Sequence, residues 1–201
     1  MPKVLLVGAE CAPLAKTGGL ADVVGTLPKS LAKLGMDARV IMPYHRIIKE
    51  KYGDRVEHLV SFYSDLGWRR EYVGLEKLVI DGVIIYLIDS EKYFGTAIYL
   101  GGDAEGEQYA YFCRAVLDAI PCLDDFQPDI LHCNDWHTAM IPMLARTQYR
   151  GGMQERLRFL LTIHNIAFQG RYSFNYVQDL LGVDGRYYTP EYMELTAAPT
   201  S

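Results

Sequence analysis

Residues 16–20 read Lys-Thr-Gly-Gly-Leu, a combination that suits the binding of an anion. Gly18 and Gly19 carry no side chain, so a ligand can come close to the backbone. The helix expected to follow would direct its N-terminal N–H groups and their partial positive charge at this point. Together with Lys16, the segment predicts a phosphate or pyrophosphate site; a plain turn with a solvated lysine is the alternative. The pattern is neither Gly-x-Gly-x-x-Gly nor a Walker loop, which disfavours nicotinamide binding and NTP hydrolysis.

A second polar segment is His132-Cys-Asn-Asp-Trp-His137. Its His132, Asp135 and His137 could be taken for metal ligands, but no fourth ligand is evident and the spacing crosses a strand–loop junction. We expect no metal here; His132 should instead be buried at a strand end, with Asp135 and His137 capping the next helix. Asp135 could still bind a ligand hydroxyl, and Trp136 offers a flat surface for a sugar ring or for packing.

A third segment, residues 162–170, contains His164 directly after an apolar strand. A single histidine in such a place is more often structural than catalytic, because its ring satisfies nearby backbone groups. Ligands of open parallel sheets bind beyond the carboxyl ends of the strands. Since all three polar segments follow strands, we expect them at one edge, which favours a functional role for His164.

The first strand and helix are predicted from apolar spacing. Residues 4–7 form a short apolar run typical of a strand buried on both faces. A helix with an apolar stripe is expected over 20–34, with a kink or break at Pro28. A second strand is expected over 38–42.

The middle of the chain predicts an antiparallel excursion. Asp81-Gly82 between apolar runs is a strong hairpin signal. Residues 93–106 are glycine-rich and are expected to form a mobile surface loop. The strands expected here are 56–63, 71–75, 77–80 and 83–88.

The remaining segments alternate between strand and helix. Strands are expected over 129–133 and 158–163, and helices over 107–120 and 138–146. This alternation predicts an α/β fold with a doubly wound, mostly parallel sheet.

Composition excludes some classes of protein. The net charge of -5 argues against a general nucleic-acid binder. No segment approaches the roughly 20 apolar residues needed to span a bilayer, and no secretion signal is visible. The four cysteines form no Cys-x-x-Cys pair, which indicates free thiols in a reducing compartment. We therefore expect a cytoplasmic protein with no nucleic-acid or membrane partner.

The three segments together resemble the N-terminal domain of bacterial glycogen synthases and plant starch synthases. The similarity rests on residues 16–23, 132–136 and 162–170, in the family's order and spacing, and extends from Lys3 to about Glu194. It implies a retaining glucosyltransferase with two Rossmann domains. Such an enzyme moves glucose from ADP-glucose, or UDP-glucose in some members, to the non-reducing 4-hydroxyl of an α-1,4-glucan. The donor is a substrate, and no cofactor or metal is implied.

The resemblance also implies roles for individual residues. Lys16 would contact the donor phosphates, and His164 would bind the donor glucose near the reacting carbon, with Asp135 as its catalytic companion. No residue resembles a nucleophile with a partner carboxylate, so front-face departure of the nucleoside diphosphate is expected. The other implied donor contacts are Thr17, Gly18, Gly19 and Asp22, and the implied glucan or sugar contacts are Asn134, Trp136, Asn165 and Gln169.

The family's proteins are about twice as long, so the resemblance implies a domain over 1–194, a frayed tail over 195–201, and a second Rossmann domain that this sequence does not contain. The chain alone is expected to be inactive, and the choice between ADP- and UDP-glucose would lie with the second domain. Three alternatives stay open: another sugar-nucleotide enzyme or a phosphorylase with two Rossmann domains, a non-catalytic glucan-binding module, and an α/β domain with unrelated ligands.

Overall fold

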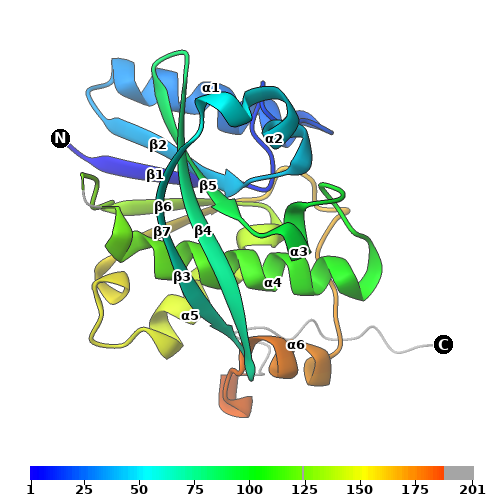
Figure 1. Cartoon of the computed structure of the whole chain (residues 1–201). Helices are drawn as coiled ribbons and strands as arrows, with labels where there is room; N and C mark the ends of the chain where they lie inside the picture. The colour runs from blue at the N-terminus through cyan, green and yellow to red at the C-terminus, as the bar shows by residue number, and fades with distance from the viewer. Residues whose placement is uncertain (124, 188–201) are drawn as a thin grey trace.

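A computed structural model describes residues 1–123 and 125–187, and its core is one seven-stranded sheet in the order β3-β4-β5-β2-β1-β6-β7 (Figure 1). The strands are β1 Lys3–Val7, β2 Asp37–Pro43, β3 Glu57–Leu66, β4 Arg69–Ile80, β5 Val83–Asp89, β6 Ile130–Asn134 and β7 Arg158–Thr162. The α-helices are α1 Gly19–Lys33, α2 Arg46–Tyr52, α3 Glu91–Phe94, α4 Gly102–Ala119, α5 Met140–Gln148 and α6 Phe174–Leu181.

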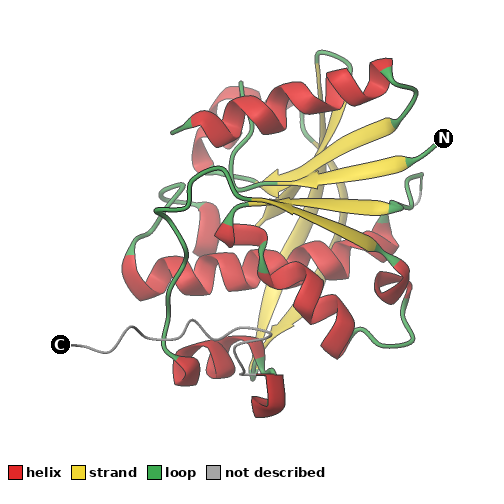
Figure 2. Cartoon of the chain, turned by 180° about the vertical axis from the view of Figure 1, so that it is seen from behind, coloured by secondary structure: helices red, strands yellow, loops and turns green. Residues whose placement is uncertain are grey.

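The central strands are parallel, as predicted. β1 pairs in parallel with β2 and β6, β2 pairs in parallel with β5, and β6 pairs in parallel with β7. Helices cover both faces of the sheet, with α1 on one side and α4 and α5 on the other (Figure 2). Leu5, Leu6 and Val7 are completely buried between these layers. The apolar run is therefore explained by burial on both faces.

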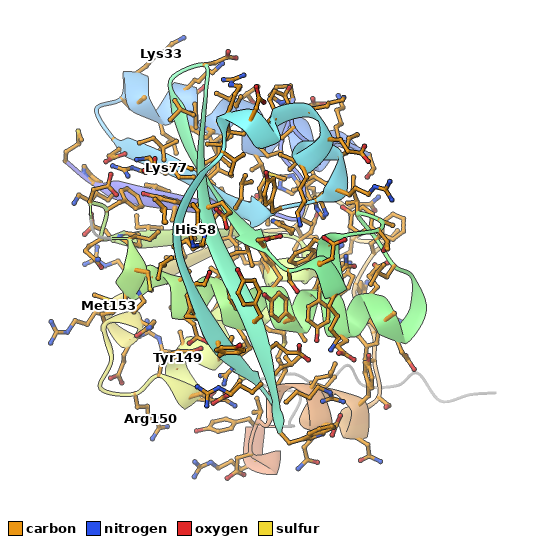
Figure 3. The ribbon with its side chains drawn as sticks, viewed as in Figure 1. Lys33, His58, Lys77, Tyr149, Arg150 and Met153 are labelled. Atoms are coloured by element: carbon orange, nitrogen blue, oxygen red, sulfur yellow. The ribbon has the colours of Figure 1, made fainter. Side chains whose placement is uncertain are left out.

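The antiparallel excursion is confirmed, because β3 pairs with β4 and β4 with β5 in antiparallel register. Asp81 and Gly82 have φ angles of 50° and 79°, as a tight hairpin turn requires. The separate short strands predicted over 71–75 and 77–80 are wrong, since β4 runs unbroken from Arg69 to Ile80. Lys77 lies within this strand, opposite Glu57 of β3. His58, the next residue of β3, lies opposite Glu76 (Figure 3).

Two further expectations are corrected. Helix α1 is one continuous element through Pro28, whose ring is buried in the core, and that burial offsets the missing N–H. The mobile loop predicted over 93–106 is wrong at both ends. Tyr93 and Phe94 are buried in α3, and α4 already begins at Gly102. The Gly101 N–H donates to the Glu105 carboxylate at 2.9 Å, so the glycines start a helix.

Among the described residues, no helix is both long and apolar enough to cross a membrane. The tail predicted over 195–201 and the boundary at Glu194 lie outside the described residues.

β7 is an edge strand of the sheet, at the end opposite β3. It and the loop that follows expose Leu160, Leu161, Ile163, Ile166 and Phe168.

Candidate functional site

The strands that precede the three polar segments end at one edge of the sheet, because β1, β6 and β7 are neighbours that run parallel. The Asn134 side-chain Nδ2 donates to the carbonyl of Val7 at 3.1 Å, which joins the end of β6 to the end of β1. The Asp135 N–H donates to the carbonyl of Thr162 at 2.9 Å, which joins β6 to β7. The predicted common edge is therefore confirmed by direct contacts.

The loop after β1 is organised by Glu10, a buried carboxylate only 2% exposed. Thr17 donates to it through both its N–H and its hydroxyl, the latter at 2.6 Å, and the Gly18 N–H donates at 3.3 Å. The Tyr99 hydroxyl, from the loop before α4, also donates to Glu10. Two N–H groups that the sequence assigned to a ligand are thus bound by the chain's own carboxylate.

These contacts set the charge of Glu10. Burial alone would raise its pKa, but the hydrogen bonds from Thr17, Tyr99 and Gly18 outweigh burial and hold the pKa below its ordinary value. The carboxylate is therefore ionised at neutral pH and fixes the path of residues 17–18.

A buried histidine lies in the same region: His45 Nε2 donates to the Ala9 carbonyl at 2.9 Å. Its Nδ1 is buried without a partner in the described chain.

Lys16 and Asp22 form an ion pair, with Nζ 2.7 Å and 2.8 Å from the two carboxylate oxygens. Both side chains are about half exposed, at 52% and 55%. An exposed pair of this kind contributes only about 0–1 kcal/mol. A phosphate that reaches the loop can therefore replace Asp22 as the partner of Lys16 at little cost in free energy.

Gly18 and Gly19 are glycines that the fold itself does not require. A Cβ built on either one meets nothing within 4 Å, and neither has a positive φ angle. Gly25 of the same helix differs, because its Cβ would lie 2.3 Å from the Ala12 carbonyl oxygen. Bare backbone at 18–19 therefore fits close approach of a ligand.

We expect the two helical glycines to respond oppositely to alanine. Gly19→Ala should raise the free energy of unfolding by about 0.5–1 kcal/mol, since alanine is the better helix former and has room. Gly25→Ala should lower it by about 1–3 kcal/mol through the clash with Ala12. Urea unfolding of the two variants beside the wild type measures both. Destabilisation by Gly19→Ala would show that packing, and not a ligand, requires that glycine.

His164 is held by two consecutive residues of the neighbouring strand end. Its backbone N–H donates to the Asp135 Oδ1 at 2.7 Å, and its ring Nε2 lies 2.9 Å from the Asn134 Oδ1. The ring itself is half-buried. The sequence predicted Asn134 as a sugar contact, but the structure places it inside the protein with 0% exposure.

Asp135 has a strained backbone. Its φ and ψ angles are 58° and -180°, a region that is populated almost only by glycine. The conformation turns the chain from β6 into the short 3₁₀ turn at Trp136–Thr138 while its carboxylate reaches His164. The sequence predicts that Asp135 caps the next helix with its side chain. Instead its backbone carbonyl accepts the Thr138 N–H at 3.2 Å, and its carboxylate binds the loop at His164.

His132 and His137 are structural in different ways. His132 Nε2 lies 2.8 Å from the Thr162 hydroxyl, and burial followed by the proximity of His164 lowers its pKa. His137 sits among Tyr99, Tyr109 and Trp136, with ring centroids 5.2, 4.5 and 4.2 Å away. Burial lowers its pKa to about 4. Within residues 1–123 and 125–187, no group of three or more acidic, cysteine or histidine side chains is placed to hold a metal ion.

Trp136 is used for packing. The backbone of Gly170 lies over its indole, since a Cβ there would be 2.1 Å from the ring. Tyr172 packs nearby, with ring centroids 5.8 Å apart. Of the two roles predicted for Trp136, the structure shows the packing role.

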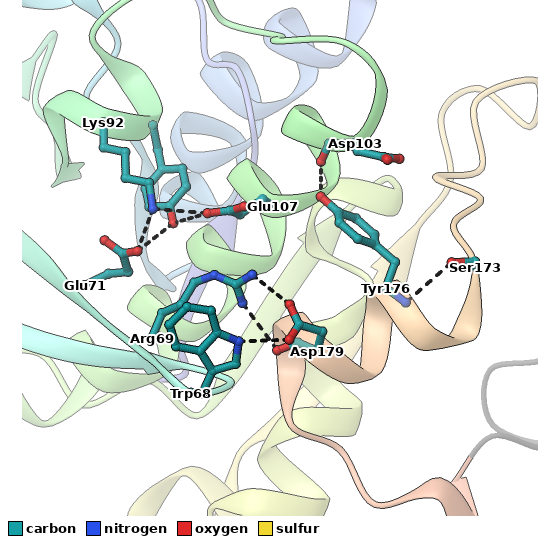
Figure 4. A network of polar contacts seen from close by, with 10 residues as sticks. Trp68, Arg69, Glu71, Lys92, Asp103, Glu107, Ser173, Tyr176 and Asp179 are labelled. Atoms are coloured by element: carbon teal, nitrogen blue, oxygen red, sulfur yellow. Dashed lines mark hydrogen bonds and ion pairs between the residues drawn. The ribbon is translucent and has the colours of Figure 1, made fainter.

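The segment after His164 is an exposed turn tied down at its far end. Asn165 Oδ1 accepts the Ala167 N–H at 3.0 Å, and Gln169 Nε2 donates to the Ile166 carbonyl at 2.9 Å. Helix α6, which follows, is bound to the tip of the β3–β4 hairpin and to α4 (Figure 4). Those anchoring contacts run from Trp68 and Arg69 to Asp179, at 2.9 and 2.7 Å, and from the Tyr176 hydroxyl to the Asp103 carbonyl.

Sequence reasoning missed Glu10 and Tyr99. Glu10 follows a buried strand by three residues, and an acidic residue in that place was a usable signal. Tyr99 meets it from 89 positions away, inside the segment interpreted as a mobile loop. Only the folded chain brings these two together.

Comparison with known proteins gives similarities over nearly the whole chain. Residues 3–198 match the sequence profile of a family described as "Starch synthase catalytic domain". The glycogen synthase of Geobacillus thermodenitrificans is 48% identical over 193 residues, which is 96% of this chain and 40% of the relative. That of Streptococcus agalactiae is 46% identical over 187 residues, covering 92% and 39%.

A solved structure is similar as well. It is the catalytic domain of starch synthase IV from Arabidopsis thaliana bound to ADP and acarbose, with a TM-score of 0.85 and 28% sequence identity. The match covers 98% of this chain and 40% of that one. This chain therefore spans about 40% of the length of the relatives it matches.

Proposed function

The chain belongs to the starch synthase catalytic domain family, and we propose that it forms one side of the active cleft of a retaining glucosyltransferase. The full-length protein would transfer glucose from ADP-glucose to the non-reducing 4-hydroxyl of an α-1,4-glucan, as a glycogen or starch synthase. A second Rossmann domain, in the part of the protein beyond this chain, would complete the cleft.

The observation that carries this proposal is the adjacency of β1, β6 and β7. It brings the loop of Lys16, Gly18 and Gly19 to the same edge as the clamped ring of His164. A cation beside bare backbone suits the donor pyrophosphate. An imidazole fixed on the neighbouring strands suits a sugar hydroxyl. Thr17 acts within this proposal by holding the loop on Glu10.

The arrangement of charges supports a front-face mechanism. Two of the carboxylates described at this edge are engaged by the protein itself: Glu10 by the loop and Asp135 by the His164 N–H, while Asp22 pairs with Lys16 in the absence of a donor. None is offered as a nucleophile for a covalent glucosyl intermediate. In the proposed step the bond from glucose C1 to the diphosphate oxygen breaks. The acceptor oxygen then bonds to C1 from the same face and its proton passes to the departing diphosphate, whose charge Lys16 stabilises.

The acceptor side of the proposal rests on exposed polar groups. We assign Asn165 and Gln169 as glucan contacts, because both are exposed on the turn after His164. The Asp135 carboxylate would make a polar contact with the sugar, and it also positions His164 through the backbone N–H. The similar plant enzyme was solved with ADP and acarbose, which supports a nucleotide site and a saccharide site in one cleft.

Two minor parts of the proposal concern location and cofactors. Cys11, Cys113 and Cys133 are buried thiols, and burial raises the pKa of Cys11 to about 12. Unoxidised thiols support a reducing compartment, and we propose the cytoplasm. The proposed transfer needs only its donor and acceptor.

The test uses the full-length protein with ADP-glucose carrying a radioactive glucose, glycogen as acceptor, and UDP-glucose as the competing donor. We expect label in the polymer, new bonds in the α configuration by NMR, and a clear preference for ADP-glucose. Retention on a glycogen affinity gel without any transfer would instead identify a glucan-binding protein and refute the proposal.

A further inference from the structure

The side-chain amide of Asn134 has a single permitted orientation. Its Nδ2 lies 3.1 Å from the Val7 carbonyl oxygen and 2.9 Å from the His132 carbonyl oxygen. Both neighbours can only accept hydrogen bonds, so the NH₂ group must face them. The reverse orientation would direct an amide oxygen at two carbonyl oxygens in the interior, where unpaired polar groups are costly. The amide is fully buried, so no solvent competes.

This orientation decides the protonation of His164. With Nδ2 committed, the Asn134 Oδ1 faces His164 Nε2 at 2.9 Å. An amide oxygen accepts and cannot donate, so Nε2 carries the hydrogen. In the neutral ring Nδ1 is then the unprotonated nitrogen, because a neutral imidazole has one N–H. Within the described chain, no hydrogen bond is made to Nδ1.

We propose that Asn134 is a positioning residue that holds His164 in the Nε2–H tautomer, so that Nδ1 accepts a hydrogen bond from a hydroxyl of the bound sugar. The second half of this statement rests on the function proposed above. The Asp135 carboxylate complements Asn134 by fixing the backbone of His164 at 2.7 Å. The ring therefore has a set position and a set polarity, and it selects a ligand group that donates.

The tautomer can be measured without substrate. Full-length protein labelled with ¹⁵N-histidine gives long-range ¹H–¹⁵N correlations that distinguish the two neutral forms, and loss of signals in His164→Gln assigns the ring. At alkaline pH we expect His164 Nδ1 at the frequency of an unprotonated nitrogen and Nε2 at that of a protonated one. An Nδ1–H form, or an even mixture of the two, would overturn the proposal by itself.

Variants of Asn134 separate positioning from general stability. Asn134→Asp keeps an oxygen facing Nε2 and should keep the Nε2–H tautomer, but at a cost in stability, because its second oxygen then faces the Val7 and His132 carbonyls. Asn134→Ala should release a mixture of tautomers and lower kcat/KM of the full-length enzyme by roughly 5- to 10-fold, the scale of one neutral hydrogen bond. Asn175→Ala, at an exposed position of α6, is the control and should leave the tautomer unchanged. Should the Asn134 variants fail to fold, the wild-type spectrum still decides.

Addition of saturating ADP-glucose tests the ligand part. We expect the Nδ1 resonance to move toward the protonated range as a hydroxyl donates to it; ADP alone should not cause this shift. An unmoved resonance in an enzyme that transfers glucose would refute the hydroxyl contact while leaving the proposed function intact. The expected tautomer in a protein that transfers no glucose would refute the proposed function alone.

Discussion

Replacing Lys16 by alanine in the full-length protein should lower kcat for glucosyl transfer by roughly 10²-fold or more, the effect of losing one preorganised charge in a transition state. The proposed reaction develops negative charge on the departing diphosphate, and Lys16 is the cation beside the bare backbone of Gly18 and Gly19. Its removal also leaves Asp22, now unpaired, next to that charge. Initial rates over a range of ADP-glucose concentrations, at saturating glycogen, measure kcat and KM separately.

Helix α1 supplies a matched control. Lys29 is another half-exposed lysine in an ion pair, but its partner is Asp81 of the β4–β5 turn, at 3.0 Å, and not Asp22. Lys29→Ala should leave kcat and KM unchanged, which separates a specific contact from a general loss of surface charge. Wild-type turnover by the Lys16→Ala enzyme would remove Lys16 from the proposed site.

The free energy of unfolding should fall steeply as the pH is lowered from 6.5 toward 4. Burial lowers the pKa of both His45 and His137 from 6.5 to about 4, so both rings are neutral in the folded protein. Below pH 6.5 the unfolded chain takes up protons that the folded chain refuses. The stability present above pH 6.5 is therefore lost progressively toward pH 4, up to about 3 kcal/mol for each histidine. Such a loss is a large part of an ordinary stability of about 5–15 kcal/mol.

Urea unfolding of the chain at a series of pH values measures this slope. His45→Gln should flatten it by about one proton, because glutamine can still donate to the Ala9 carbonyl but does not titrate in this range. Phe126→Leu is the control: its buried ring packs against Tyr86, with centroids 6.4 Å apart, and no contact with either histidine is described, so its loss should destabilise equally at every pH. An unchanged slope in His45→Gln would mean that His45 is not held neutral in the folded chain.

Much of the fold followed from local signals. The apolar run before Gly8 and the Asp81-Gly82 turn each encode their structure within a few residues, through burial on both faces and through φ angles that favour Asp and Gly. Where these signals conflicted with tertiary packing, packing prevailed. Pro28 predicts a kink or a broken turn, yet its ring is buried and α1 continues without a break. Gly101 and Gly102 predict a loop, yet they begin a helix.

The site was predicted in part. Three polar segments after three strands were enough to place it at the sheet edge, because parallel strands end on the same side. Its internal hydrogen bonds could not be read in that way. Glu10 takes up N–H groups that looked available to a ligand, and the burial of Asn134 depends on how β6 fits between β1 and β7. The contact of Asn134 with Val7 spans 127 residues of sequence, and that of Tyr99 with Glu10 spans 89.

The backbone of Asp135 has a consequence for how such a protein can be improved. At φ 58° and ψ -180°, the conformation costs on the order of 1–3 kcal/mol for any residue with a side chain, and glycine would adopt it freely. Selection for thermal stability alone would therefore favour glycine at this position. Glycine has no carboxylate to hold the backbone of His164, so the more stable variant would loosen the ring on which the proposed function depends. Under the proposed function, stabilising substitutions chosen for this domain should leave Asp135 unchanged, because its carboxylate holds His164.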